Sequence, residues 1–252
     1  MVKDTIIIKP EGGLCNRLRV IMIYLEYVNQ KNKKLKILWS ADRPIDKVVS
    51  NTHFLDIFKP LPNASFVSQE SSQNISYRGW GKGCGDLFRN ILPNVEDRLL
   101  TLKQNYSLLK LDSKLQYKAD GLARLHHPKG YASIHIRRTD HIKWLKEQSK
   151  EPVPYSAFES FIDSQANLPI YIATDNSKTQ EYFKNKYGAK VFFYEEIKDV
   201  EDLRKTSLAH AAIDLYMCSR SAAFKGTEQS SFSDSITLLR PNPHTNSRSV
   251  AR

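Results

Sequence analysis

Short apolar runs that alternate with amphipathic segments constrain the fold of this chain more than any other feature of its sequence. Ile6–Ile8 is a β-branched run typical of a buried strand, and a Gly-Gly turn separates it from apolar residues at helical spacing over 14–30. The same order returns later, where the apolar runs 131–136 and 170–173 each precede a helical pattern. Repeated strand–helix units predict parallel sheets covered by helices, which is an α/β fold.

Further strands and helices are predicted in both halves of the chain. The other predicted strands are 35–39, 65–67, 191–193 and 222–224. The other predicted helices are 46–58 in part, 94–127, 155–165, 177–187, 207–218 and 230–239. The glycine-rich segment 79–85 is predicted to be a loop.

The 252 residues are enough for two small α/β domains. A turn at His126–Gly130 is the predicted boundary. It gives Rossmann-like, doubly wound domains at 1–128 and 129–240, followed by a disordered tail over 241–252. Because ligands of such sheets lie beyond the carboxyl ends of the strands, we expect the site in a cleft that both domains face.

The charge of the chain is unbalanced, with 38 Lys and Arg against 27 Asp and Glu and a formal net charge of +11. This excess predicts an anionic partner: nucleic acid, an anionic membrane or a phosphorylated small molecule. The densest lysine cluster, over 31–36, is interrupted by Asn32 and Leu35. A solvated loop explains that cluster better than a nucleic-acid surface does. We therefore expect no nucleic-acid partner, and nucleic-acid binding stays an alternative on charge alone.

Cysteine usage and hydropathy bear on the compartment. Cys15, Cys84 and Cys218 form no Cys-x-x-Cys pair or Cys/His cluster, so free buried thiols are predicted rather than disulfides or a zinc site. No run approaches the roughly 18 apolar residues of a membrane span, and the first residues lack a signal-peptide pattern. The expectation is a cytoplasmic chain without a transmembrane segment, which can still act at a membrane face.

The most informative polar segment that follows a predicted strand is His135–Asp140, which contains adjacent arginines. Arginine suits bidentate phosphate binding. Because adjacent residues of a strand point to opposite faces, at most one of Arg137 and Arg138 reaches a given phosphate, and the other can pair with Asp140 or a second carboxylate. An Arg–Asp salt bridge that closes a loop explains the pattern about equally well.

Three further strand-end segments carry candidate groups. In Gly226–Ser233 a glycine turn with hydroxyls opens a helix, whose first N–H groups suit an anion, although simple capping by a serine is the commoner explanation. Asp175 can accept hydrogen bonds from a ribose or a guanine, or can cap a helix. Gly12-Gly13 before a helix matches neither a Walker A loop nor a GxGxxG fingerprint.

Four motifs occur in order: Gly-Gly-Leu-Cys-Asn-Arg-Leu, His-Ile-Arg-Arg-Thr-Asp, Ala-Thr-Asp-Asn and Ser-Ser-Phe-Ser. The series, which spans 6–239, resembles that of the GDP-fucose-dependent fucosyltransferase superfamily. That superfamily includes the alpha-1,6-fucosyltransferases, their bacterial nodulation relatives and the protein O-fucosyltransferases. The resemblance implies a GT-B architecture. It also implies inverting, metal-independent transfer of a sugar, L-fucose from GDP-fucose above all, to a hydroxyl of a glycan or glycoprotein.

The resemblance also implies roles for residues at matching positions. Arg137 would hold the donor diphosphate, His135 would contact the nucleoside and Asp175 would read the base or ribose. The implied donor-site residues are Gly13, Asn16, Arg17, His135, Arg137, Arg138, Asp175, Thr227, Ser230, Ser231 and Phe232. No cofactor or metal is implied, and the sequence contains no Asp-x-Asp pair of the kind that holds a cation.

Inverting transfer needs a base for the acceptor hydroxyl and positive charge for the departing diphosphate. Some relatives place a glutamate in the loop after the two arginines, which implies Glu147, with Glu151 beside it. A solvated surface charge also explains Glu147, and Glu11 and Asp140 are rivals. The predicted catalytic residues are Arg137, Asp140 and Glu147.

The chain departs from the family pattern at Cys15 and Arg17, where one branch has Gly and Gln. Another donor, such as UDP-xylose, therefore remains an alternative. So does an inactive protein that only binds a sugar nucleotide.

Overall fold

The computed structural model of the chain contains two compact units. Residues 4–39, 53–67, 75–79, 83–126, 130–165, 167–195 and 206–241 are described. Unit 1 comprises Met1–Gln116 and Thr206–Ala212, and unit 2 comprises Tyr117–Lys205 and Ile213–Arg252. Each unit has one four-stranded sheet, and all the strand pairs within both sheets are parallel.

The sheet of unit 1 has the order β3-β2-β1-β4. Its strands are β1 (Thr5–Pro10), β2 (Lys34–Leu38), β3 (Ala64–Val67) and β4 (Tyr77–Gly79). The connection from β1 to β2 is α1 (Leu14–Gln30), which buries Leu18, Ile21 and Leu25 completely. Helix α3 (Val95–Ser107) packs on α1, where the Asn105 amide donates a hydrogen bond of 2.9 Å to the Met22 carbonyl. The other helices are α2 (Gly85–Ile91) and η1 (Phe54–Asp56).

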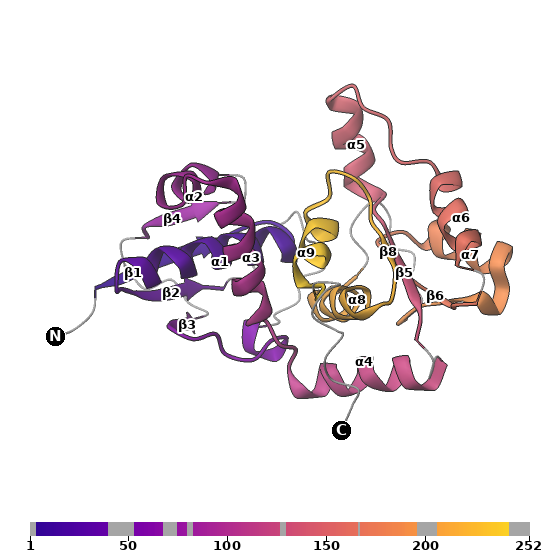
Figure 1. Cartoon of the computed structure of the whole chain (residues 1–252), viewed down its shortest axis with the longest axis horizontal. Coiled ribbons are helices and arrows are strands. Elements are labelled where there is room, and N and C mark those ends of the chain that lie inside the picture. The colour runs from indigo at the N-terminus through magenta and orange to yellow at the C-terminus, as the bar shows by residue number, and fades with distance from the viewer. Residues whose placement is uncertain are drawn as a thin grey trace. The chain divides into compact units, whose positions relative to one another are not determined.

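The sheet of unit 2 has the order β7-β6-β5-β8. Its strands are β5 (Ala132–Ile136), β6 (Ile170–Thr174), β7 (Val191–Phe192) and β8 (Phe224–Lys225). Helices α6 (Tyr155–Ser164) and α7 (Ser177–Tyr187) cover one face, whereas α8 (Leu208–Arg220) and α9 (Ser231–Leu239) lie on the other (Figure 1). The remaining elements are α4 (Ser113–His126), α5 (Thr139–Glu147) and η2 (Gly188–Lys190).

The core of unit 2 explains why β5 and β6 are continuous apolar runs. Every residue of both strands is buried, as expected for parallel strands covered on two faces. Toward α6 and α7 their isoleucines pack against Phe158 and Phe183, which are fully buried. The α/β fold with parallel sheets, predicted from the alternating pattern, is therefore confirmed.

Three local predictions differ from the structure. The region 94–127 is two helices, because α3 ends at Ser107 and Leu111 pairs with Phe58 in an isolated bridge before α4 begins. The segment 79–85 is not simply a loop, because Gly79 ends β4 and Gly85 begins α2. Residues 139–147, predicted as loop, form α5, whose buried pair His141 and Leu145 has helical spacing.

Some predictions fall outside the described residues: the helical start at 46–52, residues 127–129 of the predicted boundary, and the tail beyond Pro241. The three cysteines are buried thiols, as predicted. Within the described part of the chain, no helix is both long and apolar enough to cross a membrane.

Two buried tyrosines on the unit 2 sheet allow a matched test of its packing. The Tyr171 hydroxyl donates to the Asp214 carboxylate at 2.5 Å, and the Tyr131 hydroxyl donates to the Met217 carbonyl at 2.8 Å. Loss of a hydrogen bond to a charged group costs about 1.5–3 kcal/mol, against about 1 kcal/mol for a neutral one. We expect Tyr171→Phe to lower the free energy of unfolding in urea more than Tyr131→Phe does. An equal loss of unfolding free energy in the two variants would contradict the stronger hydrogen bond assigned to Tyr171.

Candidate functional site

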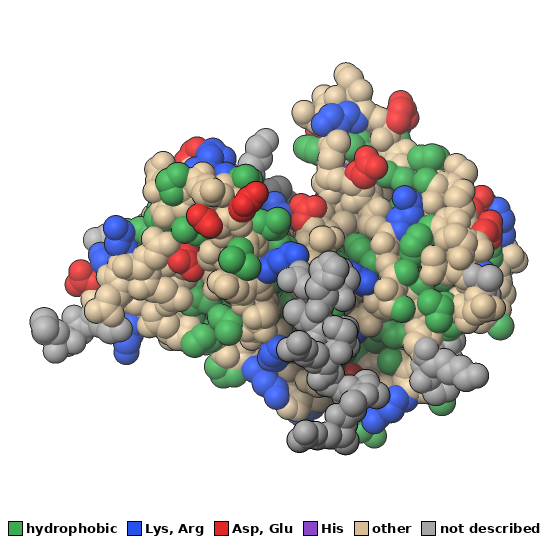
Figure 2. Space-filling model, viewed as in Figure 1, with side chains coloured by type: hydrophobic (Ala, Val, Ile, Leu, Met, Phe, Trp, Pro, Cys, Tyr) green, Lys and Arg blue, Asp and Glu red, His purple; other side chains and the backbone are tan. Residues whose placement is uncertain are grey.

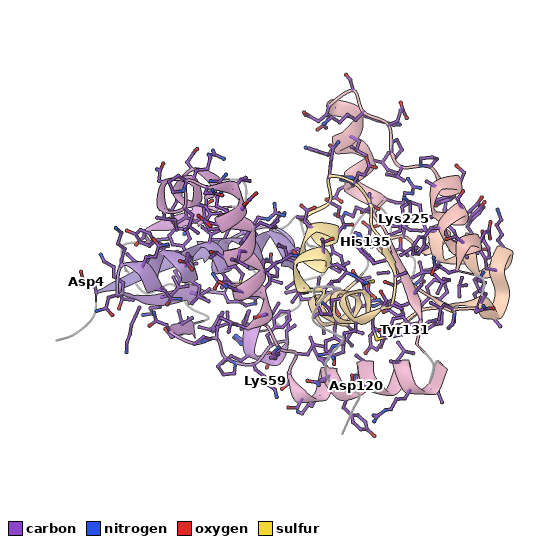
Figure 3. All side chains as sticks on the ribbon, viewed as in Figure 1. Asp4, Lys59, Asp120, Tyr131, His135 and Lys225 are labelled. Carbon is purple, nitrogen blue, oxygen red and sulfur yellow. The ribbon has the colours of Figure 1, made fainter. Side chains whose placement is uncertain are left out.

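The carboxyl ends of three strands meet at one edge of the unit 2 sheet. Because β6, β5 and β8 are adjacent and parallel, they bring together residues 137–140, 175–176 and 226–230. In Figure 3 the labelled Tyr131 directly precedes β5, and the labelled His135 lies near the other end of the strand, where the site forms. The site therefore forms where the rule for ligands of parallel sheets places it.

Thr227 joins the segment after β8 to the end of β5. Its hydroxyl donates to the His135 carbonyl at 2.8 Å and accepts from the Arg137 N–H at 2.9 Å. Its own N–H donates to Ser233 Oγ at 2.9 Å. With the side chain buried, these three bonds fix the backbone on which Arg137 is carried.

Ser233 and Phe232, from the first turn of α9, enclose the His135 ring. Ser233 Oγ lies 2.8 Å from His135 Nδ1, and the Phe232 ring stacks on the imidazole with centroids 4.6 Å apart. A Cβ on Gly226 would lie 2.6 Å from Ser233 Oγ, closer than such atoms approach, so this turn requires glycine. The glycine turn thus lets the serine reach both the histidine and Thr227.

The Asp175 carboxylate organises the turn after β5. Its Oδ1 accepts from the Arg138 N–H at 2.9 Å, and its Oδ2 lies 2.7 Å from Arg137 Nη1 and accepts from the Thr139 hydroxyl. Asp175 is 5% exposed. Its partners are the chain's own groups, and the prediction that it reads a base or ribose stays a prediction.

The two arginines diverge, as the alternation of side chains along a strand predicts. Arg137 pairs with Asp175 and Asp140, and its side chain is 16% exposed. Arg138 turns toward α6, where it donates to the Val153 carbonyl at 2.8 Å and lies 4.5 Å over the Tyr155 ring. The salt bridge considered as an alternative is present, and it holds the Arg137 guanidinium in a defined place.

The other predicted donor residues of unit 2 lie at the start of α9. Ser230 occupies the N-cap position without a side-chain capping bond, and Ser231 and Phe232 begin the helix. The first N–H groups of α9 are therefore not satisfied by the Ser230 hydroxyl. This leaves them suited to an anion.

Glu147 is not grouped with these residues. It ends α5 and is exposed, whereas Asp140 lies near the start of the same helix beside Arg137. Seven residues of helix separate the two carboxylates by about 10 Å along the axis.

Gly13, Asn16 and Arg17 belong to unit 1. Gly13 is the N-cap of α1. Arg17 is buried, donates from Nε to the Gly12 carbonyl at 2.7 Å and lies 5.0 Å over the Trp39 ring. Arg17 thus stabilises its own loop, and its predicted donor contact stays a prediction.

Sequence reasoning did not single out Thr139, Ser233, Gly226 or Tyr155. Thr139 and Ser233 lie within the four motifs, and Gly226 opens the turn before α9. The sequence therefore marked the positions of these residues but did not indicate which contacts they make. Nothing in the sequence marks Tyr155 as the ring that supports Arg138. In the described ranges, no three His, Cys, Asp or Glu side chains are grouped so that they could hold a metal ion.

The imidazole of His135 is neutral at ordinary pH. Burial, together with the nearby Arg137 and His141, lowers the pKa of His135 to about 3. Burial and Arg137 also lower the pKa of His141, whose Nε2 is buried without a hydrogen-bond partner in the described structure. Positive charge at this site therefore comes from arginine rather than from histidine.

The lowered pKa of His135 predicts a pH dependence of stability. In the unfolded chain a histidine has a pKa of about 6.5, so between about pH 6.5 and 3 the unfolded state binds a proton that the folded state does not. Stability is therefore lost as the pH falls through this window, by up to about 1.4 kcal/mol per pH unit. We expect urea unfolding of His135→Phe, which retains an aromatic ring beside Phe232, to lose that slope between about pH 5.5 and 4.5. Because His141 is present in both proteins, its contribution to the pH dependence is the same in both. An unchanged slope of unfolding free energy against pH would show that His135 is not the group that takes up the proton on unfolding.

Comparisons with known proteins rest on structure alone, because no protein-family model and no curated protein matches the chain. A crystal structure of NodZ alpha-1,6-fucosyltransferase soaked with GDP-fucose is 14% identical, with a TM-score of 0.60, and the match covers 95% of this chain and 93% of that one. A NodZ structure from Bradyrhizobium is also 14% identical, with a TM-score of 0.58 and coverage of 96% and 95%. POFUT1 in complex with GDP is 8% identical, with a TM-score of 0.62 and coverage of 95% and 97%. The chain therefore has the fold of these fucosyltransferase structures, as its motif series predicted.

Proposed function

We propose that this chain is an inverting, metal-independent glycosyltransferase that moves a sugar, L-fucose from GDP-fucose, to a hydroxyl of a glycan or glycoprotein. The observation that carries the proposal is the fixed position of Arg137 at the carboxyl end of β5, held by Asp175 and Thr227. The motif residues His135 and Ser233 support the same edge of the sheet. Solved structures of the same fold contain GDP or GDP-fucose, which favours this donor.

Arg137 and the start of α9 supply what a departing nucleoside diphosphate needs. A guanidinium held by carboxylates is oriented before the donor arrives, and it can stabilise negative charge that grows on the leaving group. The uncapped N–H groups of α9 add hydrogen-bond donors and a partial positive charge. In this scheme no metal ion is needed to balance the diphosphate.

The architecture proposed is GT-B, with 129–240 as the donor domain and 1–128 as the acceptor domain. The groups suited to a diphosphate all belong to the former range. Gly13, Asn16 and Arg17 of the latter are proposed to bind the donor.

Asp140 is the proposed general base. It contacts Arg137, the group assigned to the donor, and its side chain is 52% exposed, so an acceptor hydroxyl can approach it. Glu147 lies about 10 Å further along α5.

Replacement of Arg137 tests donor binding. We expect Arg137→Ala to weaken binding of GDP and GDP-fucose by about ten- to a hundredfold, the effect of losing a charged hydrogen-bond donor. Arg137→Lys should recover only part of this, because a lysine cannot bind bidentately. Titration calorimetry is the measurement. Arg220→Ala, which removes an exposed arginine over Tyr216, is the matched control.

The same titrations distinguish among donors and functions. A panel of GDP-fucose, GDP-mannose and UDP-xylose identifies the donor, and transfer in excess EDTA tests independence from metal. Binding to none of these nucleotides would remove the proposal, and binding without transfer to any glycan would favour an inactive sugar-nucleotide-binding protein.

Replacement of each carboxylate by its amide tests which residue is the general base. We expect Asp140→Asn to lower kcat by about a hundredfold or more while GDP binding is retained, and Glu147→Gln to change kcat little. Because Asp140 also orients Arg137, the pH profile is measured as well, and loss of the base removes the acid limb of kcat. The opposite ranking would assign the base to Glu147. Full activity in both variants would exclude both carboxylates.

A further inference from the structure

A basic pocket opens on the face of the unit 2 sheet opposite to His135. It has a volume of about 530 Å³ and lies along α5 and beside the starts of α6 and α7. Whereas His135 faces α9, Arg138 and Tyr155 of the pocket belong to the face that α6 and α7 cover. A volume of this size suits a small molecule or part of a larger one.

The lining of the pocket is cationic. Arg138, Lys143, Lys146 and Lys178 are four of its eight residues, and none of the eight is acidic. Lys143 and Lys146 lie three residues apart on one face of α5. The three lysines are exposed, and none forms an ion pair with a carboxylate in the described ranges. Such a group of like charges is relieved by an anion.

Asn176 adds a hydrogen-bond donor to the pocket. The Asn176 Oδ1 atom accepts from the N–H and the hydroxyl of Thr179, at 2.9 and 3.0 Å. The NH2 group of Asn176 therefore remains for another partner. The first turn of α7 adds the partial positive charge of a helix start. Donors together with cations select an oxyanion.

Thr139 links the pocket to the cluster around Arg137. Thr139 lines the pocket, and the Thr139 hydroxyl also bonds to Asp175 and lies 3.2 Å from Asp140 Oδ1. A ligand in the pocket would lie next to the groups assigned to donor and base. This place suits an acceptor better than a remote regulatory molecule.

We propose that the pocket binds the oxyanion group, a carboxylate, sulfate or phosphate, of an acidic saccharide acceptor. The identity of the ligand as an acceptor rests on the proposed function. The cationic site itself does not. Within unit 2, on the right of Figure 2, the blue Lys and Arg side chains stand in small separate groups, and red Asp and Glu side chains lie among them. A compact anionic group fits this distribution better than a long nucleic acid.

The test compares a hyaluronan tetrasaccharide, which carries carboxylates, with the neutral chitotetraose in titrations against the full chain. We expect the acidic saccharide to bind at least about tenfold more tightly, with an affinity that falls as salt rises. The variant Lys143→Gln/Lys146→Gln/Lys178→Gln should reduce this preference about tenfold, the scale of three exposed ion pairs. The charge-matched control is Lys110→Gln/Lys114→Gln/Lys118→Gln, which removes exposed lysines before and on α4.

Each alternative result contradicts the proposal. Equal behaviour of the two saccharides, including no binding of either, removes it, and so does an equal loss in the α4 control. Inorganic phosphate or sulfate that binds as tightly as the saccharide would make the pocket a simple oxyanion site. Displacement of the saccharide by GDP would assign the pocket to the donor.

Failure of the proposed function is recognised separately. GDP titration of the triple variant should match that of the unchanged protein, because Arg137 is intact. If the unchanged protein binds no nucleotide, the glycosyltransferase proposal fails while the saccharide comparison still decides the pocket. A sulfated and a phosphorylated saccharide of the same length then identify which oxyanion is preferred.

Discussion

The ion pair between Asp175 and Arg137 is the contact on which the rest of the site depends. One buried carboxylate at the end of β6 receives the Arg137 guanidinium, the Arg138 N–H and the Thr139 hydroxyl, all from the turn after β5. Removing one partner of a buried pair leaves an uncompensated charge, at a cost of about 3–5 kcal/mol. The turn therefore has one favoured arrangement, and that arrangement sends Arg137 and Arg138 to different faces of the sheet.

A second set of bonds fixes the same turn from the β8 side. Thr227 holds the backbone at His135 and Arg137, and Ser233 holds Thr227 and the His135 ring. Because His135 remains neutral, this side of the site contributes shape and hydrogen bonds while arginine contributes the charge. Two strands thus position one guanidinium, so little has to reorganise when a charged ligand binds.

The sequence was sufficient to predict every described strand except β4, most helices and the fold, because buried parallel strands such as β5 and β6 are continuous apolar runs with polar residues at their carboxyl ends. The sequence was insufficient to predict α5. Only two of its nine residues are buried, so the pattern of apolar residues at helical spacing is too weak to indicate a helix. The motifs located Arg137, His135 and Asp175. They could not indicate that Asp175 is held within the chain or that Tyr155 supports Arg138, because those contacts join segments far apart in the sequence.

The positions of individual cations show which of them contribute uncompensated charge near the site, which the net charge of +11 alone does not indicate. Arg137 supplies a localised cation at the site, but its two carboxylate partners compensate that charge, so it does not add to the net charge of the region. Lys143, Lys146 and Lys178 have no such partners in the described ranges, so the uncompensated charge of this region lies in the pocket behind Arg138. Screening limits the attraction of these lysines to roughly 10 Å at moderate salt, which is the scale of the pocket itself. The excess charge near the site is therefore suited to hold one anionic group in place.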